Sequence, residues 1–300
     1  MDLMESETTG DAKTLLTEAM FLLDGAGLQS PQADARTLLA HVLGIDLGNL
    51  VLVDEVSDSD RRAFLRLVDR RATGTPLQHI TGVAHFRTID VVVGRGVFVP
   101  RPETEVMTGW AVERLTEITR AGRAPRVVEL CCGSGAISLA LTAEVPPASG
   151  PDGEQPVEIH AVELSGDAMQ WATRNLGGSG VSLYQADMAD ALGELDGTCD
   201  LVIANPPYIP LAAYEGVPEE VRRNDPEVAL FSGEDGLDAM RVLSGVAARL
   251  LKPGGLVCAE HAELQEASAP QVFVDQGQWH TVRDHRDLND RPRFVTAIRN

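Results

Sequence analysis

From about residue 104 onward, short apolar segments alternate with segments of helical periodicity. The predicted strands are 126–130, 158–162, 181–185, 200–204, 255–260, 280–285 and 293–299, and the predicted helices are about 104–121, 136–144, 166–176, 236–251 and 263–276. Strands that alternate with helices form a parallel sheet with right-handed crossovers. The turn from Asp284 to Pro292 leaves no room for a helix, so we expect the last strand to run antiparallel to its neighbour. The predicted fold class is α/β.

The first part of the chain predicts helices. Leu15, Ala19 and Leu22 recur at helical spacing, and Ser30 is a candidate N-cap for a second helix. A third helix is predicted over 58–73. These segments predict a small all-α region before the alternating pattern begins.

Between the two regions, residues 85–93 and 97–99 are β-rich and flank a glycine-containing turn. Two such runs around a short turn predict a β-hairpin. We therefore expect three parts, namely a helical domain over 1–83, a β-hairpin linker over 84–103 and an α/β domain over 104–300.

Composition limits the partners of the chain. The formal net charge is −20 over 300 residues, whereas a protein that grips a nucleic-acid backbone needs a basic face to release counterions. The first ten residues carry three acidic side chains and no basic apolar stretch, which is typical of a frayed tail rather than of a signal peptide. No apolar run approaches the roughly 20 residues that span a bilayer. We expect a cytoplasmic monomer without a nucleic-acid or membrane partner.

The cysteines and histidines do not predict a metal site. None of the four cysteines has the C-x-x-C spacing of a zinc or redox site, and we interpret them as buried thiols. His79, His85 and His261 do not form a metal-binding set, so we interpret them as structural residues.

A glycine-rich turn follows the first predicted strand of the α/β domain. It consists of Glu129, Leu130, Cys131, Cys132, Gly133, Ser134 and Gly135. Glycine is needed where a ligand approaches the backbone closely, and ligands bind at the carboxyl edge of an open sheet. A G-x-G turn on its own is also compatible with a tight turn that binds nothing.

The next two strands support a nucleoside site. Glu163 ends the second strand, where a carboxylate can accept hydrogen bonds from both ribose hydroxyls. Asp187 follows the third strand and can accept from an adenine amino group, or alternatively cap a following helix. A dinucleotide such as NAD would need a turn that cradles pyrophosphate, but Cys131 replaces the first glycine of that fingerprint. The expected cofactor is therefore S-adenosyl-L-methionine.

The tetrapeptide Asn205, Pro206, Pro207 and Tyr208 directly follows the fourth predicted strand. The first and fourth strands are neighbours in a sheet of this class, so the tetrapeptide is expected beside the glycine turn. A proline-rich loop with a packed tyrosine is the structural alternative.

The residue types in this tetrapeptide suit methyl transfer to a planar nitrogen. The lone pair of an amide or aniline-like nitrogen is delocalised, so the group must be held in place. The Asn205 side-chain oxygen and the Pro206 carbonyl can each accept one N–H and thereby aim the lone pair at a sulfonium methyl group. Prolines preorganise the backbone, and Tyr208 offers an aromatic face. No strong base is required, because the methylated cationic nitrogen loses its proton readily.

At these residues the chain resembles the bacterial peptide chain release factor N5-glutamine methyltransferases. The resemblance extends from Pro76 to Ala297 and includes the stretches 98–105, 232–237 and 251–255. It implies a seven-stranded Rossmann-like class I methyltransferase sheet after a five-helix N-terminal domain, which we expect to dock the substrate. It also implies methylation of the glutamine in the Gly-Gly-Gln loop of class 1 release factors, which would be the protein partners.

The resemblance also implies roles for individual residues. The substrate glutamine would be bound by Asn205, Pro206, Pro207 and Tyr208, of which Asn205, Pro206 and Tyr208 are the expected catalytic residues. The cofactor pocket would be lined by Glu129, Cys131, Cys132, Gly133, Ser134, Gly135, Glu163, Asp187, Met188 and Asn205. The chain departs from the family pattern at Glu129, where the family usually has Asp, and at Cys131, where it usually has Gly.

Other functions fit parts of the same pattern. A glutamine methyltransferase acting on a ribosomal protein resembles this family, although its sequence usually differs at 98–105. An N6-adenine DNA or RNA methyltransferase also uses this tetrapeptide, but the basic pairs 61–62, 70–71 and 222–223 are sparse for that purpose. A non-catalytic binding module is disfavoured because Asn205 is intact.

Overall fold

A computed structural model describes residues 9–150 and 153–300. The predicted frayed tail at the N-terminus lies almost entirely outside the described residues. The chain divides into two compact units, Met1–Gly82 and Val83–Asn300.

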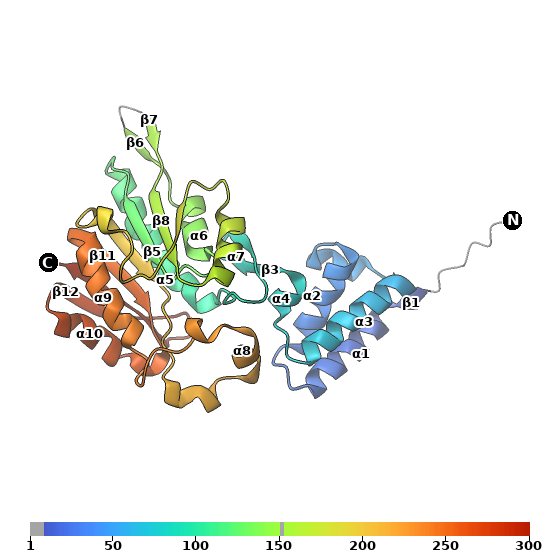
Figure 1. Cartoon of the computed structure of the whole chain (residues 1–300). Coiled ribbons are helices and arrows are strands. Elements are labelled where there is room, and N and C mark those ends of the chain that lie inside the picture. The colour runs from blue at the N-terminus through green and yellow to red at the C-terminus, as the bar shows by residue number, and fades with distance from the viewer. Residues whose placement is uncertain (1–8, 151–152) are drawn as a thin grey trace. The chain divides into compact units, whose positions relative to one another are not determined.

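The first unit is helical (Figure 1). Its described residues form four α-helices, one 3-10 helix and one antiparallel strand pair, where the resemblance implied five helices. The elements are β1 Thr9–Asp11, α1 Ala12–Gly25, α2 Pro31–Leu43, η1 Leu47–Leu52, β2 Glu55–Ser57, α3 Asp58–Ala72 and α4 Leu77–Thr81.

The helical periodicity of the first unit is confirmed with one correction. Leu15, Ala19 and Leu23 are buried in its core, whereas Leu22, which we grouped with Leu15 and Ala19 by its spacing, is 58% exposed. Steps of four residues keep one helix face inward, and Leu22 falls beside that face. Ser30 does lie at the N-cap of α2, but its side chain makes no capping hydrogen bond.

The β-hairpin lies earlier in the chain than predicted. β3 (Val83–Phe86) pairs antiparallel with β4 (Ile89–Val92), and the turn falls at Arg87 and Thr88. Residues 97–99 form no strand. The predicted turn at 94–96 is present and is closed by a hydrogen bond from the Val97 N–H to the Gly94 carbonyl, but it does not join two paired strands. Gly94 is also closely packed there, since a Cβ on it would lie 2.6 Å from the Trp171 ring.

The second unit is built on a seven-stranded sheet with the order β12-β13-β11-β10-β5-β8-β9. As predicted, β13 runs antiparallel, and it does so to both β11 and β12, while the other neighbours are parallel. The strands are β5 Arg126–Leu130, β8 Glu158–Glu163, β9 Ser182–Gln185, β10 Cys199–Ala204, β11 Leu251–Glu260, β12 Trp279–Arg286 and β13 Pro292–Arg299.

Helices cover both faces of this sheet (Figure 1). Alternate strand residues point to opposite faces, so Val127 packs in one apolar cluster with α5, α6 and α7 while Val128 packs in another with α9 and α10. This arrangement is the α/β fold expected from the sequence. The helices are α5 Pro102–Arg120, α6 Ala136–Glu144, α7 Gly166–Leu176, α8 Glu219–Asn224, α9 Asp238–Leu250 and α10 Ser268–Gln276, with short 3-10 helices η2 Gly193–Leu195, η3 Leu211–Gly216, η4 Glu227–Ala229 and η5 Glu263–Gln265.

The segment 146–156 contains two short antiparallel strands, β6 (Ala148–Gly150) and β7 (Gly153–Gln155). This hairpin lengthens the connection between α6 and β8, and hence the spacing between the glycine turn and Glu163. Among the helices described, none is long and apolar enough to cross a membrane.

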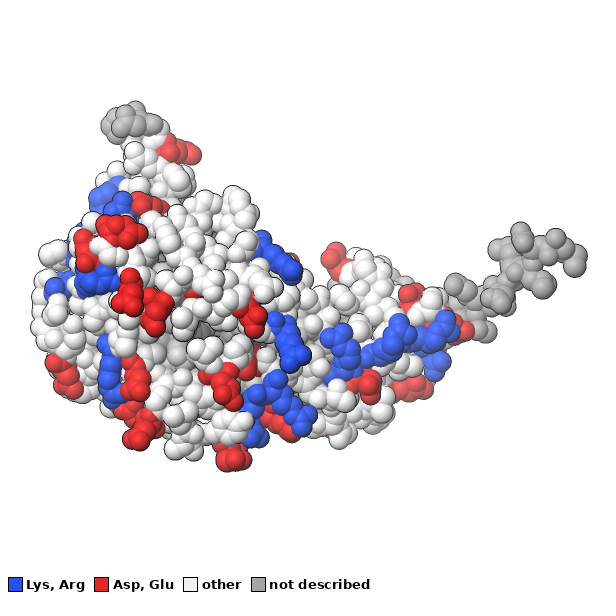
Figure 2. Space-filling model, in the orientation of Figure 1, with Lys and Arg blue, Asp and Glu red and all other residues white. Residues whose placement is uncertain are grey.

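Charged side chains are distributed differently over the two units. Figure 2 shows acidic and basic groups intermixed on the visible face of the second unit, whereas basic groups gather along α3 of the first. α3 carries five arginines and three aspartates. Arg71 is buried and pairs with Asp34 at 2.7 Å, and Arg223 pairs with Glu219, so two of the three basic pairs considered above are partly neutralised.

Candidate active site

Three loops meet at the carboxyl edge of the sheet because β5 lies between β8 and β10. The register places Leu130 beside both Val162 and Ala204. The residues that follow these three positions are Cys131 of the glycine turn, Glu163 and Asn205. The predicted proximity of the first and fourth strands is thus confirmed.

A cavity of about 850 Å³ opens at this edge. Its lining includes most of the residues predicted for the cofactor and the acceptor, although Gly135 and Pro206 are not among them. The predicted residues that line it are Glu129, Cys131, Cys132, Gly133, Ser134, Glu163, Asp187, Met188, Asn205, Pro207 and Tyr208.

The glycine turn has the left-handed backbone that its sequence suggests. The φ angles of Cys131, Gly133 and Gly135 are +57°, +55° and +79°. A Cβ on Gly135 would lie 2.9 Å from Leu176 of α7, so this glycine permits close helix packing. Cys131 is the unusual residue, because a side chain disfavours this conformation.

Glu129 is buried and is already engaged within the protein. Its Oε2 accepts hydrogen bonds from the Ser138 backbone N–H at 2.8 Å and from the Ser138 hydroxyl. Ser138 lies in the first turn of α6, where backbone N–H groups lack helical partners. Burial raises the pKa of Glu129 to about 8. This side chain therefore anchors α6, the helix that follows the turn, in addition to lining the cavity.

Glu163 braces the turn from the neighbouring strand. One carboxylate oxygen accepts from the Gly133 N–H and the other from the Ser165 N–H, both at 2.8 Å. Each carboxylate oxygen can accept more than one hydrogen bond, so these contacts leave capacity for further donors.

Asp187 and Met188 follow β9. The Asp187 side chain accepts from the Ala189 N–H at 2.9 Å, and a turn rather than an α-helix follows it. The alternative interpretation of Asp187 as a helix N-cap is therefore wrong. Met188 Sδ lies 3.9 Å from Cys131 Sγ. Burial raises the pKa of Cys131 to about 12, so its thiol stays protonated at neutral pH.

Asn205 begins the loop after β10 and is held through its amide nitrogen. Nδ2 donates to the Thr104 hydroxyl at 3.2 Å, and Thr104 donates to Glu260 Oε2 at 2.6 Å. The Tyr208 hydroxyl donates to Glu260 Oε1 at 3.2 Å. Burial and the Glu260 carboxylate raise the pKa of Tyr208 above its usual value, so the phenol stays protonated.

Thr104 and Glu260 are site residues that we did not predict. Both are buried and both line the cavity. Glu260 could have been found, because it is an acidic residue at the carboxyl end of the predicted strand 255–260. Thr104 lies in the stretch 98–105 that carries the resemblance, but nothing in its spacing indicates a partner 156 residues away.

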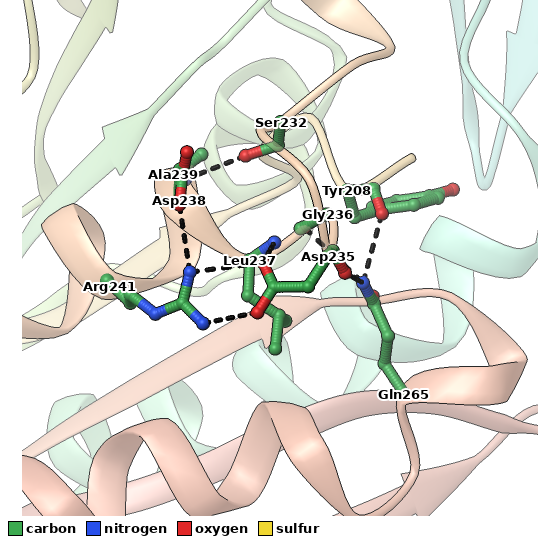
Figure 3. Close-up of polar contacts among 9 residues, drawn as sticks. All are labelled: Tyr208, Ser232, Asp235, Gly236, Leu237, Asp238, Ala239, Arg241 and Gln265. Carbon is green, nitrogen blue, oxygen red and sulfur yellow. Dashed lines mark hydrogen bonds and ion pairs between the residues drawn. The ribbon is translucent and has the colours of Figure 1, made fainter. Parts of the chain in front are cut away.

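The loop 232–237 and Gln265 pack against the backbone of the tetrapeptide at Tyr208 (Figure 3). Gln265 Nε2 donates to the backbone carbonyl of Tyr208 at 3.0 Å and to that of Gly236 at 3.3 Å. Gly236 has a φ of +78°, and a Cβ there would overlap the Tyr208 carbonyl oxygen. Asp235 is held in turn by an ion pair with Arg241. This loop therefore fixes the position of the Tyr208 backbone at the cavity.

The segment 209–231 also contributes to the cavity, and the sequence did not indicate this. It supplies apolar lining residues such as Val217, Val221 and Leu230. Asp225, whose side chain is 1% exposed, ties the segment to Arg101 through an ion pair of 3.0 Å. Burial raises the pKa of Asp225 to about 6, although the Arg101 cation favours the charged form.

The described residues contain no group of three or more His, Cys, Asp and Glu that could hold a metal ion.

Comparison with known proteins agrees with this geometry. Residues 90–215 match the model of the methyltransferase small domain, and residues 14–82 match that of the PrmC N-terminal domain. The sheet, its helices and the first of these matches define the chain as a methyltransferase. The family and fold imply a methyl donor of the S-adenosylmethionine type.

Similarity to curated relatives extends over nearly the whole chain. It is 48% identical to the release factor glutamine methyltransferase of Streptomyces coelicolor, over 94% of this chain and 96% of the relative. It is 41% identical to that of Mycolicibacterium smegmatis, over 96% and 97%. It is also 40% identical to the 4-amino-L-phenylalanine/4-methylamino-L-phenylalanine methyltransferase of Streptomyces pristinaespiralis, over 97% of each chain. The chain belongs to the release factor glutamine methyltransferase family.

Proposed function

We propose that the protein transfers a methyl group from S-adenosyl-L-methionine to the side-chain nitrogen (N5) of the glutamine in the Gly-Gly-Gln loop of class 1 release factors. The observation that carries the proposal is the placement of Asn205 and Tyr208 in the same cavity as the glycine turn. The full-length similarity to release factor glutamine methyltransferases supports this acceptor over others.

The residues around the glycine turn fit this cofactor. Glu163 has spare acceptor capacity for two ribose hydroxyls, and Asp187 is a carboxylate beside the position expected for adenine. Gly133 has no neighbouring atom within 4 Å of a would-be Cβ, which leaves room for close approach of a ligand. When bound, the cofactor supplies an electrophilic methyl group on a sulfonium.

The acceptor nitrogen is positioned by the tetrapeptide. Because the Asn205 nitrogen donates to Thr104, its Oδ1 lies on the other side of the amide and can accept an N–H of the substrate. The Pro206 carbonyl would accept the second N–H, and Tyr208 would pack on the planar amide. Holding both hydrogens aims the lone pair at the methyl carbon, and such positioning supplies much of the rate enhancement.

A second candidate acceptor is an arylamine. The relative from Streptomyces pristinaespiralis is named for methylation of 4-amino-L-phenylalanine, and its identity to this chain is close to that of the release factor enzymes. An aniline nitrogen has the same two hydrogens and delocalised lone pair as an amide nitrogen. The same tetrapeptide can therefore serve both acceptors.

Charge disfavours nucleic acid as the acceptor. The cavity lining contains six acidic residues and two arginines, whereas a phosphate backbone requires basic contacts.

We further propose that the helical unit 1–83 docks the release factor. In this proposal the linker 84–103 and the methyltransferase domain 104–300 are the other two parts of the chain. We place the protein in the cytoplasm and propose that it acts as a monomer.

The proposal is tested with isotopically labelled S-adenosylmethionine and separate acceptors. These are unmethylated release factor, ribosomes that lack the modification, DNA and 4-amino-L-phenylalanine. Asn205→Ala is compared with wild type and with Asn289→Ala, a variant at an exposed site between β12 and β13 and outside the cavity lining. We expect label on the Gly-Gly-Gln glutamine, located by mass spectrometry, and its loss only in Asn205→Ala.

Other outcomes would redirect the assignment. Label only in the free amino acid would establish the arylamine function, and label only in ribosomes or DNA would retain the fold and cofactor but reject the release factor. No label in any acceptor together with no cofactor binding would overturn the proposal as a whole.

A further inference from the structure

We propose that Thr104 and Glu260 are positioning residues that fix which face of the Asn205 amide meets the acceptor. This inference rests on the proposed function, because it assigns the orientation of a residue in that same site. Neither residue was part of the constellation expected from the sequence.

The inference starts from a continuous chain of hydrogen bonds. Asn205 Nδ2 donates to Thr104 Oγ1, Thr104 Oγ1 donates to Glu260 Oε2, and the Tyr208 hydroxyl donates to Glu260 Oε1. Thr104 is 4% exposed and Glu260 is 1% exposed, so water has little access to compete for these bonds. The chain thus links the two tetrapeptide side chains expected to touch the acceptor through one buried carboxylate.

The direction of this chain follows from the number of available protons. A threonine hydroxyl has one hydrogen, and a carboxylate has none. An ionised Glu260 can therefore only accept, so the Thr104 hydrogen must point towards it. The Thr104 oxygen is then free to accept, which requires the Asn205 NH₂ group on that side. As a result Asn205 Oδ1, an acceptor, is the atom presented to the N–H of the substrate.

A donor in place of the carboxylate would reverse the direction. If Glu260 carries a proton on Oε2, or is replaced by Gln, it can donate to Thr104. Thr104 then donates to Asn205 Oδ1, and the amide turns its NH₂ group towards the acceptor. An NH₂ group cannot accept a hydrogen bond from the substrate NH₂, so the acceptor loses one of its two anchors.

The surroundings of Glu260 place this reversal near neutral pH. Burial raises the pKa of Glu260 to about 7, while the Thr104 bond, Arg293 and the Tyr208 bond favour the charged form and Glu103 opposes it. The neighbouring α5 thus contributes Glu103 and Thr104, β13 contributes Arg293, and the loop after β10 contributes Tyr208. Activity should fall as the pH drops below about 7, because the neutral form of Glu260 then accumulates.

Three variants test the inference. Thr104→Val keeps the shape and removes the hydroxyl, Thr104→Ser restores the hydroxyl, and Glu260→Gln makes the terminal group a donor. We expect kcat to fall about 100-fold in Thr104→Val and Glu260→Gln, as for a misplaced acceptor. Thr104→Ser should remain within about tenfold of wild type. Glu260→Gln should also lose the acidic limb of the pH profile, while cofactor affinity is retained in all three.

A second measurement does not depend on any acceptor. In isotope-labelled protein, the Asn205 side-chain NH₂ signals can be identified by their absence in Asn205→Ala. Bonding to Thr104 should slow their exchange with solvent, and Thr104→Val and Glu260→Gln should accelerate it. If wild type methylates no release factor but shows this pattern, the proposed function fails and the orientation stands.

Two results would overturn the inference. One is unchanged kcat and unchanged amide exchange in both Thr104→Val and Glu260→Gln. The other is a parallel loss of cofactor affinity and decrease in melting temperature in these variants, without rescue by Thr104→Ser. That result would mean that these hydrogen bonds only stabilise the fold.

Discussion

At the scale of single residues, Cys131 occupies a backbone conformation that suits glycine. Its φ of +57° costs a residue with a side chain about 1 kcal/mol. We predict that Cys131→Gly is more stable than Cys131→Ala by about 1 kcal/mol, because both lose the thiol and only Gly relieves the strain. Urea unfolding of the two variants measures this difference. Equal midpoints would show that the turn tolerates a side chain without strain.

Gly236 leaves space for the Tyr208 carbonyl at the site. In Gly236→Ala the new methyl group would overlap the Tyr208 carbonyl and lie 2.8 Å from Gln265 Nε2. We predict that Tyr208 shifts and that kcat falls by about 100-fold. Gly254→Ala is the matched control, because Gly254 has the same φ of +78° with no atom within 4 Å of its would-be Cβ. Steady-state kinetics should show the loss only at Gly236, and an equal loss in both would point to strain alone.

At the scale of elements, the hairpin and α6 are joined by an ion pair. Arg87, in the turn between β3 and β4, donates two hydrogen bonds to Glu144 at the end of α6. These bonds lower the pKa of Glu144 below its usual 4.5. The stabilisation is therefore complete above pH 4.5 and is lost as the pH falls through the lower pKa of the folded state.

We predict that Glu144→Gln lowers the free energy of unfolding by about 1.5 kcal/mol at neutral pH. The difference from wild type should shrink as the pH falls below 4.5 and through the lower pKa of the folded state, where Glu144 becomes protonated. Glu113→Gln is the control, because Glu113 is exposed and its contact with Arg114 is a loose 3.6 Å. Denaturant unfolding across this pH range checks the prediction, and a pH-independent difference would contradict it.

The same scale shows what the sequence could and could not predict. The strands and helices of the sheet follow local periodicity, so β5, α6 and α7 were predicted within a residue of their ends. The hairpin was misplaced because residues 97–99 are β-rich for another reason: Val97 and Val99 are buried in the core of the second unit.

The contribution of the segment 209–231 was not predicted because its sequence has no helical or strand periodicity of apolar residues. Its path depends on contacts with distant residues, such as Asp225 with Arg101 and the bridge between Ile209 and Phe231. Local propensity contains no information about such contacts. The glycine turn, Glu163 and Asn205 could be predicted because each follows a strand, whereas Thr104 enters the site from a helix.

At the scale of the whole molecule, the helical unit has its own apolar core. We predict that a chain starting at Val83 keeps its cofactor affinity, because all cavity-lining residues lie beyond Gly82. If the helical unit docks the release factor, KM for the intact factor should rise at least about tenfold, while that for a short Gly-Gly-Gln peptide should not change. Calorimetry and steady-state kinetics separate the two effects. An unchanged KM for the intact factor would remove the docking role.

The position of β13 has a consequence for biosynthesis. β13 follows β12 in the chain but lies between β11 and β12 in the sheet. During synthesis β12 therefore leaves the ribosome before it has a strand to pair with, and the open edge of β11 remains unpaired until β13 arrives. An open edge of this kind invites pairing with other chains. The sheet of the nascent protein is thus most vulnerable to aggregation in the interval between the emergence of β11 and that of β13.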